Sequence, residues 1–216
     1  ANGLPPKVEP CVPAVIPVSA GELLPALLHG RGDIAIANLT VTPERQQFVD
    51  FSAPLWTGVD EVVVTGPASP PIASVDDLSG QELFVRLSSS YFQSLWHVNE
   101  RFGKSGLPPL RVKAAPEQLE DEDILEMLNA GLIPLAVVDS HKAEFWAQLL
   151  PNIRLDPEGA VRTGGEIAWA GRKSSPQLAA VVNEFAAKHG KGTQFGNAKF
   201  KEYLRNTQYV QDASST

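Results

Sequence analysis

The stretch "NLTVTPERQQFVDFS", residues 38–52, follows the apolar run "DIAIA" at 33–37, which predicts a buried strand. Because that run shows no polar alternation, we expect the strand to be covered on both faces, as in a parallel sheet. The chain then turns polar, with Asn38, Thr40 and Arg45 ahead of a second short apolar run. Polar side chains directly after a core strand of an α/β protein are typical of a ligand site at the end of that strand.

The composition is that of a globular protein and argues against several classes. The 216 residues are 43% hydrophobic and 20% charged, which suffices for one large domain or two small lobes. A net charge of −7, with no cluster of lysines and arginines, argues against a nucleic-acid partner. No apolar run reaches the roughly 18 residues of a membrane span. The acidic run "EQLEDEDILE" at 117–126 is interpreted as a solvated helix start.

Strands alternate with helices along the chain. Residues 1–18 hold five prolines, which excludes a helix there, and Ser19 with Glu22 matches a capping box that opens a short helix. Further strands are predicted at 60–66, 82–87, 110–115, 133–139 and 165–173. Further helices are predicted at 88–103, 120–131, 140–151, 175–190 and 198–210. This alternation predicts an α/β fold with mostly parallel sheets.

A connector rich in proline and serine divides the chain. It occupies 67–80 and indicates a crossing into a second lobe, and the strand near 165–171 indicates the return. We therefore expect a discontinuous first lobe of residues 1–66 and 168–216, and a second lobe of residues 67–167. A cleft between two such lobes is a common place for a ligand.

Two further stretches place polar groups at strand ends. Ser88, Ser89 and Ser90 precede a helix, where hydroxyls, free backbone N–H groups and the positive end of the helix dipole suit an anion. Arg45 offers a planar fork of donors that fits a carboxylate. Asp139 ends an apolar strand and is suited to an ammonium group. Together these groups match a zwitterionic ligand.

Each of these residues also has a purely structural interpretation. Asn38 and Thr40 would satisfy a turn. Ser88 and Asp139 would each cap the helix that follows. Arg45 would form a surface ion pair. The residue types leave these alternatives open.

Arg86 comes two residues before the serines, at the end of the strand predicted over 82–87. We expect its side chain to project toward the cleft and to select for a second acidic group on the ligand, because a second arginine near Arg45 would otherwise face a like charge. The alternative is a solvent-facing strand residue. His97 and His141 are the histidines nearest the predicted site, and both are expected at the surface.

Residues 21–55, "GELLPALLHGRGDIAIANLTVTPERQQFVDFSAPL", resemble the first-lobe signature of the periplasmic polar-amino-acid-binding proteins. The resemblance covers about residues 19–205 and implies a two-lobed clamshell. It implies that an arginine clamps the ligand α-carboxylate, that a nearby loop and a serine-rich segment line the cleft, and that an aspartate holds the α-amino group. The matching positions are Arg45, then Asn38 and Thr40, then Ser88, Ser89 and Ser90, and finally Asp139. The opening strand and helix of that family have no counterpart, so the first lobe is expected to be incomplete at its N-terminus.

Two segments carry a narrower resemblance. "VRLSSSYFQSL" at 85–95 and "GTQFGNAKFKEYLRNTQYVQDA" at 192–213 are similar to the binding-protein-like N-terminal domain of membrane-bound lytic murein transglycosylase F. This implies a place in the periplasm or on the periplasmic side of the outer membrane, and a peptidoglycan-derived ligand. The catalytic glutamate motif of that enzyme's lytic domain is not found in the sequence, so we expect a binding module and not an enzyme.

The sequence therefore predicts a solute-binding module that closes on an amino acid or a short peptidoglycan-derived peptide. It would regulate or position a lytic-transglycosylase domain, without a metal or cofactor. One alternative is the amino-acid receptor of an ABC transporter, whose partner is a permease. Another is a small dehydratase-type enzyme on the same fold, which would need an acid or base in the cleft.

Overall fold

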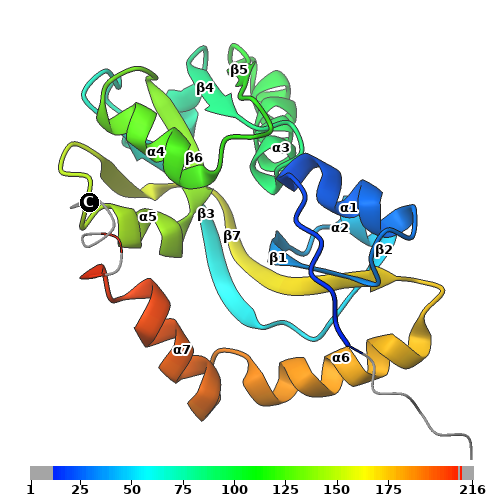
Figure 1. The fold of residues 1–216 in the computed structure, drawn as a ribbon. Coiled ribbons are helices and arrows are strands. Elements are labelled where there is room, and N and C mark those ends of the chain that lie inside the picture. The colour runs from blue at the N-terminus through cyan, green and yellow to red at the C-terminus, as the bar shows by residue number, and fades with distance from the viewer. Residues whose placement is uncertain (1–11, 209, 211–216) are drawn as a thin grey trace, which may run out of the picture.

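The computed structural model describes residues 12–208 and 210 (Figure 1). Among these residues the helices and strands follow one another in the order α1 (Ala20–Leu28), β1 (Ile34–Thr40), α2 (Pro43–Gln46), β2 (Val49–Phe51), β3 (Trp56–Thr65), a 3₁₀ turn η1 (Val75–Leu78), β4 (Glu82–Val85), α3 (Ser90–Ser105), β5 (Arg111–Ala114), α4 (Asp121–Asn129), β6 (Leu135–Asp139), α5 (Ser140–Trp146), β7 (Arg154–Arg172), α6 (Pro176–His189) and α7 (Gln194–Leu204). The described part of the proline-rich segment, residues 12–18, forms no helix, as predicted, and no strand; residues 1–11 lie outside the described part.

Local capping groups set where the helices begin. The predicted capping box is confirmed, with Ser19 and Glu22 satisfying each other's backbone at the start of α1. At α2 the hydroxyl of Thr42 accepts from the backbone N–H of Arg45 at 3.2 Å. At α3 the cap is Ser89, whose hydroxyl accepts from the backbone of the first turn at 3.2 Å. These caps fix the direction of the chain on both sides of the site described below.

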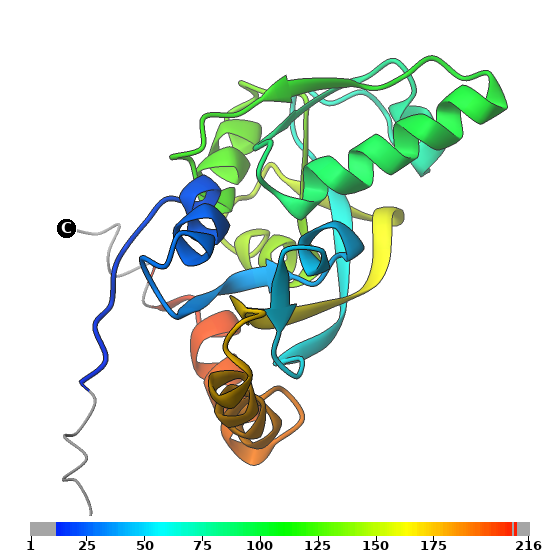
Figure 2. The same cartoon turned by 90° about the vertical axis from the view of Figure 1, so that its right-hand side faces the viewer.

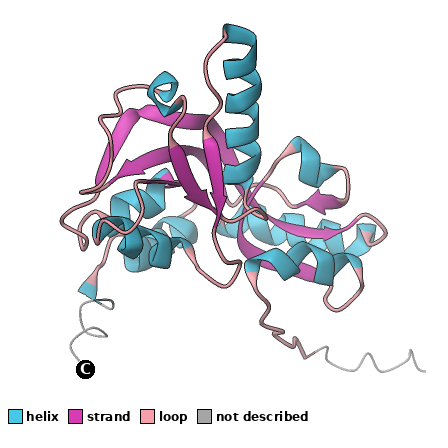
Figure 3. Cartoon of the chain, turned by 90° about the horizontal axis from the view of Figure 1, so that it is seen from above, coloured by secondary structure: helices cyan, strands magenta, loops and turns pink. Residues whose placement is uncertain are grey.

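The main sheet is antiparallel, so the prediction of mostly parallel sheets is wrong. Its strand order is β1-β7-β3-β6, with β2 also paired to β7, and all of these pairs are antiparallel. Only β4 and β5, joined through α3, form the expected parallel pair. The difference arises from β7, which is 19 residues long and returns against three strands at once. Figure 3 shows the helices lying around these strands.

Strand β1 is an edge strand and is not covered on both faces as expected. Residues 36–38 are exposed, and the side chain of Ile36 is 62% exposed. The register of β1 against β7 is irregular between Ala35 and Leu39. An end position in the sheet leaves one edge of the strand without a neighbour among the described residues.

The described residues form two hydrophobic cores. Figures 1 and 2 show the long strands β3 and β7 running side by side through the molecule. The side chains of the larger core come mainly from β4, β6, α3, α4 and the second half of β3. The smaller core consists of Leu27, Ala35, Leu39, Val49 and Ala170. Strands β3 and β7 pass from one core to the other, and their pairing shifts register several times between residues 57 and 64. The assignment of residues 1–66 and 168–216 to one lobe and 67–167 to the other stays a prediction.

None of the helices in the described part of the chain combines the length and the apolar character that crossing a membrane requires.

Candidate functional site

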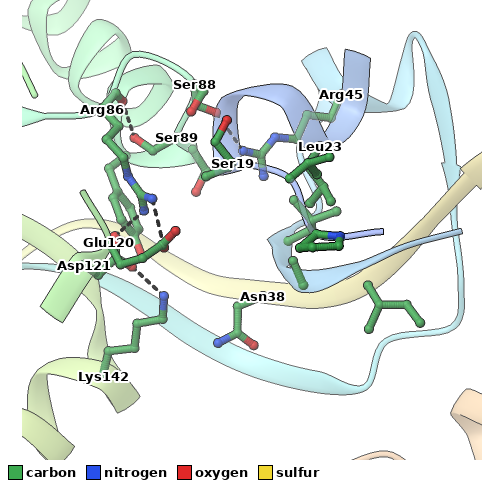
Figure 4. A pocket seen from close by; sticks show the side chains of 18 of the residues that line it. Ser19, Leu23, Asn38, Arg45, Arg86, Ser88, Ser89, Glu120, Asp121 and Lys142 are labelled. Atoms are coloured by element: carbon green, nitrogen blue, oxygen red, sulfur yellow. Dashed lines mark hydrogen bonds and ion pairs between the residues drawn. The ribbon is translucent and has the colours of Figure 1, made fainter. Parts of the chain in front are cut away.

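A cavity of about 310 Å³ lies where α1, β1 and α2 face the start of α3 and α4 (Figure 4). Six of the eight residues predicted from the sequence line it, namely Asn38, Arg45, Arg86, Ser88, Ser89 and Ser90. The other two, Thr40 and Asp139, are buried and do not line the cavity. The fold therefore brings most of the predicted site together, and the role of each residue in binding stays a prediction.

Arg45 reaches across the cavity wall from one region to the other. One terminal nitrogen donates to the carbonyl of Thr40 at 2.9 Å, and the other donates to the carbonyl of Ser88, at the start of α3, at 3.1 Å. Burial lowers the pKa of the guanidinium from its ordinary value, while the charge of Glu61 raises it. The structure thus gives Arg45 backbone partners instead of the surface ion pair that the sequence left open.

The serines at the start of α3 each have a different partner. Ser89 caps the helix, so the interpretation of Ser88 as the cap is wrong. Ser88 instead donates its backbone N–H and its hydroxyl to the carboxylate of Glu117. Ser90 donates to the hydroxyl of Thr40 at 3.1 Å, which joins α3 to β1. A side-chain carboxylate already lies at the start of this helix, which indicates that the place suits an anion.

Arg86 lies in a buried network of charges. It is paired with Asp121 at 2.5 Å and with Glu120 at 3.1 Å, and Lys142 reaches Asp121 at 2.5 Å (Figure 4). Burial alone would raise the pKa of Asp121, but Lys142 and Arg86 hold it below its ordinary value. The acidic run was expected to be solvated, yet Asp121 is only 2% exposed, so that expectation is wrong for this residue. Since carboxylates already balance Arg86, it does not need a ligand carboxylate to offset a like charge.

Two buried carboxyl groups face one another at the junction of the cores. Glu61 of β3 lies opposite Asp139 of β6 in the antiparallel register, so both side chains project to the same face. One oxygen of each has no hydrogen-bond partner among the described residues, while Ser94 donates to the other oxygen of Glu61. Burial raises the pKa of Asp139 to about 7. Asp139 occupies the cap position of α5 without a side-chain capping bond.

The two histidines differ from each other. His97 is exposed, as expected, and its ring lies 3.3 Å from Glu44. His141 was expected at the surface and is instead 5% exposed, with its ring centroid 4.2 Å from that of Trp56. Burial lowers the pKa of His141 to about 3, so its imidazole is neutral. Neither histidine lines the cavity.

Sequence reasoning missed several residues near the site. These are Glu61, Tyr91, Glu117, Glu120, Asp121 and Lys142. A charged residue directly before three buried valines was a signal for Glu61. Tyr91 donates to Asp121 at 2.9 Å and accepts from the backbone of Asp139 at 3.2 Å, which no local pattern indicates. The described residues contain no group of three or more side chains suited to a metal ion.

The family model of the bacterial extracellular solute-binding proteins, family 3, matches residues 10–198. This chain belongs to that family. Among curated members, a membrane-bound lytic murein transglycosylase F of Desulfosudis oleivorans is 27% identical over 163 residues, covering 76% of this chain and 34% of the relative. The same enzyme of Shewanella pealeana is 32% identical over 133 residues, covering 62% of this chain and 26% of the relative. This member of the family thus spans about a third or less of those relatives.

Solved structures of family-like proteins share the fold. An ancestral arginine-binding protein bound to arginine superposes with a TM-score of 0.71 at 24% identity, covering 88% of this chain and 79% of the other. A substrate-binding protein of an amino acid ABC transporter gives 0.72 at 23% identity, covering 88% and 78%. Identities this low establish the fold of periplasmic amino-acid-binding proteins and leave the ligand of this family member to be argued from its own site.

Proposed function

We propose that this protein closes on a small ligand with a free carboxylate, either an amino acid or a short peptidoglycan-derived peptide. The observation that supports it is Arg45, which extends from α2 to Ser88 at the start of α3 along the cavity wall. Its side chain donates to two neutral carbonyls, those of Thr40 and Ser88. A ligand carboxylate would form stronger, charge-assisted bonds to the same fork, so it would favour the closed arrangement.

The opposite charge of the ligand would lie near the buried carboxyl pair. Asp139 and Glu61 each have an oxygen without a partner among the described residues, and an ammonium group would satisfy both. They do not line the present cavity, so the ligand would have to enter while the two regions are apart. Strands β3 and β7, with their irregular register near residues 57–62, are the segments that would bend in such a hinge motion.

The relatives support a role at the cell wall. Two of them are lytic transglycosylases, which favours a role for this chain as a domain that regulates or positions a peptidoglycan-cleaving enzyme. Its place would be the periplasm or the periplasmic side of the outer membrane. The amino acid ABC transporter neighbour supports the alternative, a transport receptor whose partner is a permease.

An enzymatic role has less support. One structural neighbour is the ancestral amino-acid-binding protein AncCDT-1, a precursor of cyclohexadienyl dehydratase, with a TM-score of 0.67 at 23% identity. A dehydratase needs an acid or base in contact with its substrate. Asp139 has a suitable pKa of about 7 but does not line the cavity, and His141 is buried and neutral.

Calorimetric titration with the twenty L-amino acids and the stem tripeptide L-Ala-D-Glu-diaminopimelate tests this proposal. Arg45→Ala should weaken any ligand found by about 2–5 kcal/mol, the usual effect of truncating one partner of a desolvated charge pair. Arg45→Lys should keep only part of the binding free energy that Arg45→Ala loses, because a point charge cannot form two parallel bonds. Arg101→Ala is the matched control, since Arg101 is exposed and pairs with Asp76 away from the cavity. Equal affinity for Arg45→Lys would contradict the two-bond geometry, and turnover of a prephenate-like acid would favour the enzyme.

A further inference from the structure

One end of the cavity beside Arg45 is lined by four charged side chains that bind one another. They are Arg86, which follows β4, Glu120 and Asp121 at the start of α4, and Lys142 in α5. Arg86 pairs with Glu120 at 3.1 Å and with Asp121 at 2.5 Å. Lys142 reaches the other oxygen of Asp121, also at 2.5 Å. Figure 4 shows these four residues, the charged wall, on one side of the pocket and Arg45 on the other.

The charged wall carries no net charge, because its two cations and two carboxylates cancel. Burial would raise the pKa of Asp121, but Lys142 and Arg86 lower it below its ordinary value. Burial would likewise lower the pKa of Lys142, whereas Asp121 raises it. A wall with an excess of one sign would favour a ligand group of the opposite sign. Here a charged ligand group would stay uncompensated in a partly buried place, which is costly.

The charged wall still has hydrogen-bonding groups to offer a ligand. The ammonium of Lys142 has three N–H donors, and among the described residues Asp121 alone accepts from it. The carboxylate of Glu120 accepts from Arg86 and caps the start of α4, which uses only part of its acceptor capacity. Its side chain is 53% exposed, and that of Lys142 is 21% exposed. The wall therefore offers donors at Lys142 and an acceptor at Glu120.

We propose that the ligand is an α-amino acid whose side chain carries no net charge and ends in both a hydrogen-bond donor and an acceptor. The side-chain donor lies at Glu120 and the acceptor at Lys142, while the α-carboxylate lies at Arg45. This rests on the proposed function and names the substrate class for it. The α-ammonium group keeps the place that the proposed function gives it, at Glu61 and Asp139, which lie outside the charged wall.

The neutrality of the wall favours this class over the side chains of glutamate, lysine and leucine. The carboxylate of glutamate would accept from Lys142 but would bring a negative charge that the wall does not balance. The ammonium of lysine would bring an unbalanced positive charge close to Arg86 and Lys142. The isobutyl group of leucine would cover the donors and the acceptor of the wall without replacing their hydrogen bonds to water.

Two kinds of amino acid have the required chemistry. In glutamine the amide N–H donates to Glu120, and the amide oxygen accepts from Lys142. In diaminopimelate a second amino-acid head does the same with its ammonium and its carboxylate, whose charges cancel. A peptide that ends in diaminopimelate fits less well. The α-amino group of its last residue is part of a peptide bond, so it brings no ammonium to Glu61 and Asp139.

The test is calorimetric titration of the 216-residue chain with six probes. They are L-glutamine, meso-diaminopimelate, L-glutamate, L-lysine, L-leucine and the stem tripeptide L-Ala-D-Glu-diaminopimelate. We expect the tighter of glutamine and diaminopimelate to exceed each of the other four by about 10-fold or more in affinity. Which of the two binds more tightly identifies the group that the wall recognises, an amide or a second amino-acid head. If glutamate, lysine, leucine or the tripeptide binds as tightly as the better of the two, the inference is overturned.

Two variants change the charge of the wall in opposite directions. Glu120→Gln leaves an excess positive charge, so the affinity for glutamate relative to the better neutral ligand should rise about 5-fold or more. Lys142→Gln leaves an excess negative charge, so the relative affinity for lysine should rise by a similar factor. Each ratio is measured within one protein, so a general loss of affinity cancels. The side chain of Glu120 is half exposed, so Glu120→Gln alone decides the question if Lys142→Gln does not fold.

Matched controls for these variants come from the same or a neighbouring helix. Glu126 in α4 and Lys104 in α3 are exposed and lie outside the cavity. Glu126→Gln and Lys104→Gln remove the same charges and should leave both ratios within about 2-fold of the wild type. If Glu120→Gln changes the ratio no more than Glu126→Gln does, the charged wall does not select the ligand and the inference is overturned.

The outcomes distinguish this inference from the proposed function. If amino acids bind and Arg45→Ala weakens them, but charged or apolar side chains bind as well as neutral polar ones, the selection by the wall is wrong and the proposed function stands. If Arg45→Ala leaves the affinity of the best ligand unchanged, or none of the amino acids and peptides binds, the proposed function is wrong and the inference falls with it.

Discussion

The two hydrophobic cores differ in size and in how they are closed. Counting the described residues, twenty-three buried side chains form the larger cluster and five form the smaller one. The larger region balances Asp121 with Arg86 and Lys142, whereas in the smaller region β1 pairs on one side only among the described residues. The difference indicates that the larger region is the fixed wall of the site. The smaller region, with few buried contacts of its own, depends more on contacts across the cavity.

The largest expected effect concerns Asp139 in the larger region. Unlike Asp121, its buried carboxyl group has an oxygen without a hydrogen-bond partner among the described residues. Its pKa is about 7 in the folded protein against an ordinary value of 3.8. Below pH 4 the group is protonated in both states, whereas between pH 4 and 7 only the unfolded state gains by ionising. Stability is therefore lost as the pH rises, by about 4 kcal/mol at one pKa unit per 1.36 kcal/mol. The unfolding free energy, measured by denaturant unfolding from pH 4 to 8, tests this expected loss of stability.

Asp139→Asn is the control for that measurement. It removes the titration and keeps the size of the side chain. The unfolding free energy of the variant minus that of the wild type should therefore rise from pH 4 to pH 7 and stay constant above pH 7. A difference between the two proteins that does not vary with pH would show that Asp139 ionises normally.

Glu61 lies opposite Asp139, so a ligand ammonium group bound at this pair should cause Asp139 to release a proton near pH 7. Calorimetric titrations in two buffers of different ionisation enthalpy would detect this proton.

A smaller effect is the difference in the cost of a Leu→Ala substitution between the two cores, for which we expect about 2 kcal/mol. Leu125 is fully buried in the larger cluster and Leu27 is 2% exposed in the smaller one. Leu→Ala substitutions cost about 2–5 kcal/mol, and more where the surroundings cannot collapse. We expect about 4 kcal/mol for Leu125→Ala and about 2 kcal/mol for Leu27→Ala in urea unfolding. Equal costs would mean that the smaller core is packed as firmly as the larger one.

The smallest expected effect concerns the contact that joins the regions. Ser90→Ala removes the hydroxyl that donates to Thr40 across the cavity. The net value of one such hydrogen bond is about 1 kcal/mol, so unfolding should change by about that amount. Ser105→Ala, at the far end of the same helix, is the comparison. A much larger loss for Ser90→Ala would show that this contact holds the smaller region in place.

Local signals in the sequence predicted the helices and six residues of the cavity wall. Capping residues such as Ser19 and turn residues such as Pro43 act within a few positions, so their effect is visible in the chain. The polar residues Asn38 and Arg45 were recognised because they follow the apolar run at 33–37. These are features that short-range chemistry determines.

The missed features depend on pairs of residues far apart in sequence. The first half of β7, residues 154–164, is rich in charge and glycine, and its strand conformation comes from β3 beside it. Its antiparallel direction therefore had no local signal. His141 is buried because Trp56 covers it, and Asp121 because Arg86 and Lys142 neutralise it. No residue near either one in the sequence indicates these partners.

The place of β7 in the chain has a consequence for synthesis. Strands β1 and β2, within residues 34–51, pair with β7 at residues 154–172 and with no other described strand. As the chain leaves the ribosome from its N-terminus, these two strands must wait for more than a hundred further residues before their partner exists. The larger core can assemble meanwhile from residues 62–153, all of which emerge earlier than β7. The candidate site is therefore completed late, once β7 has paired with the strands before and after Arg45 and this residue can reach its place opposite α3.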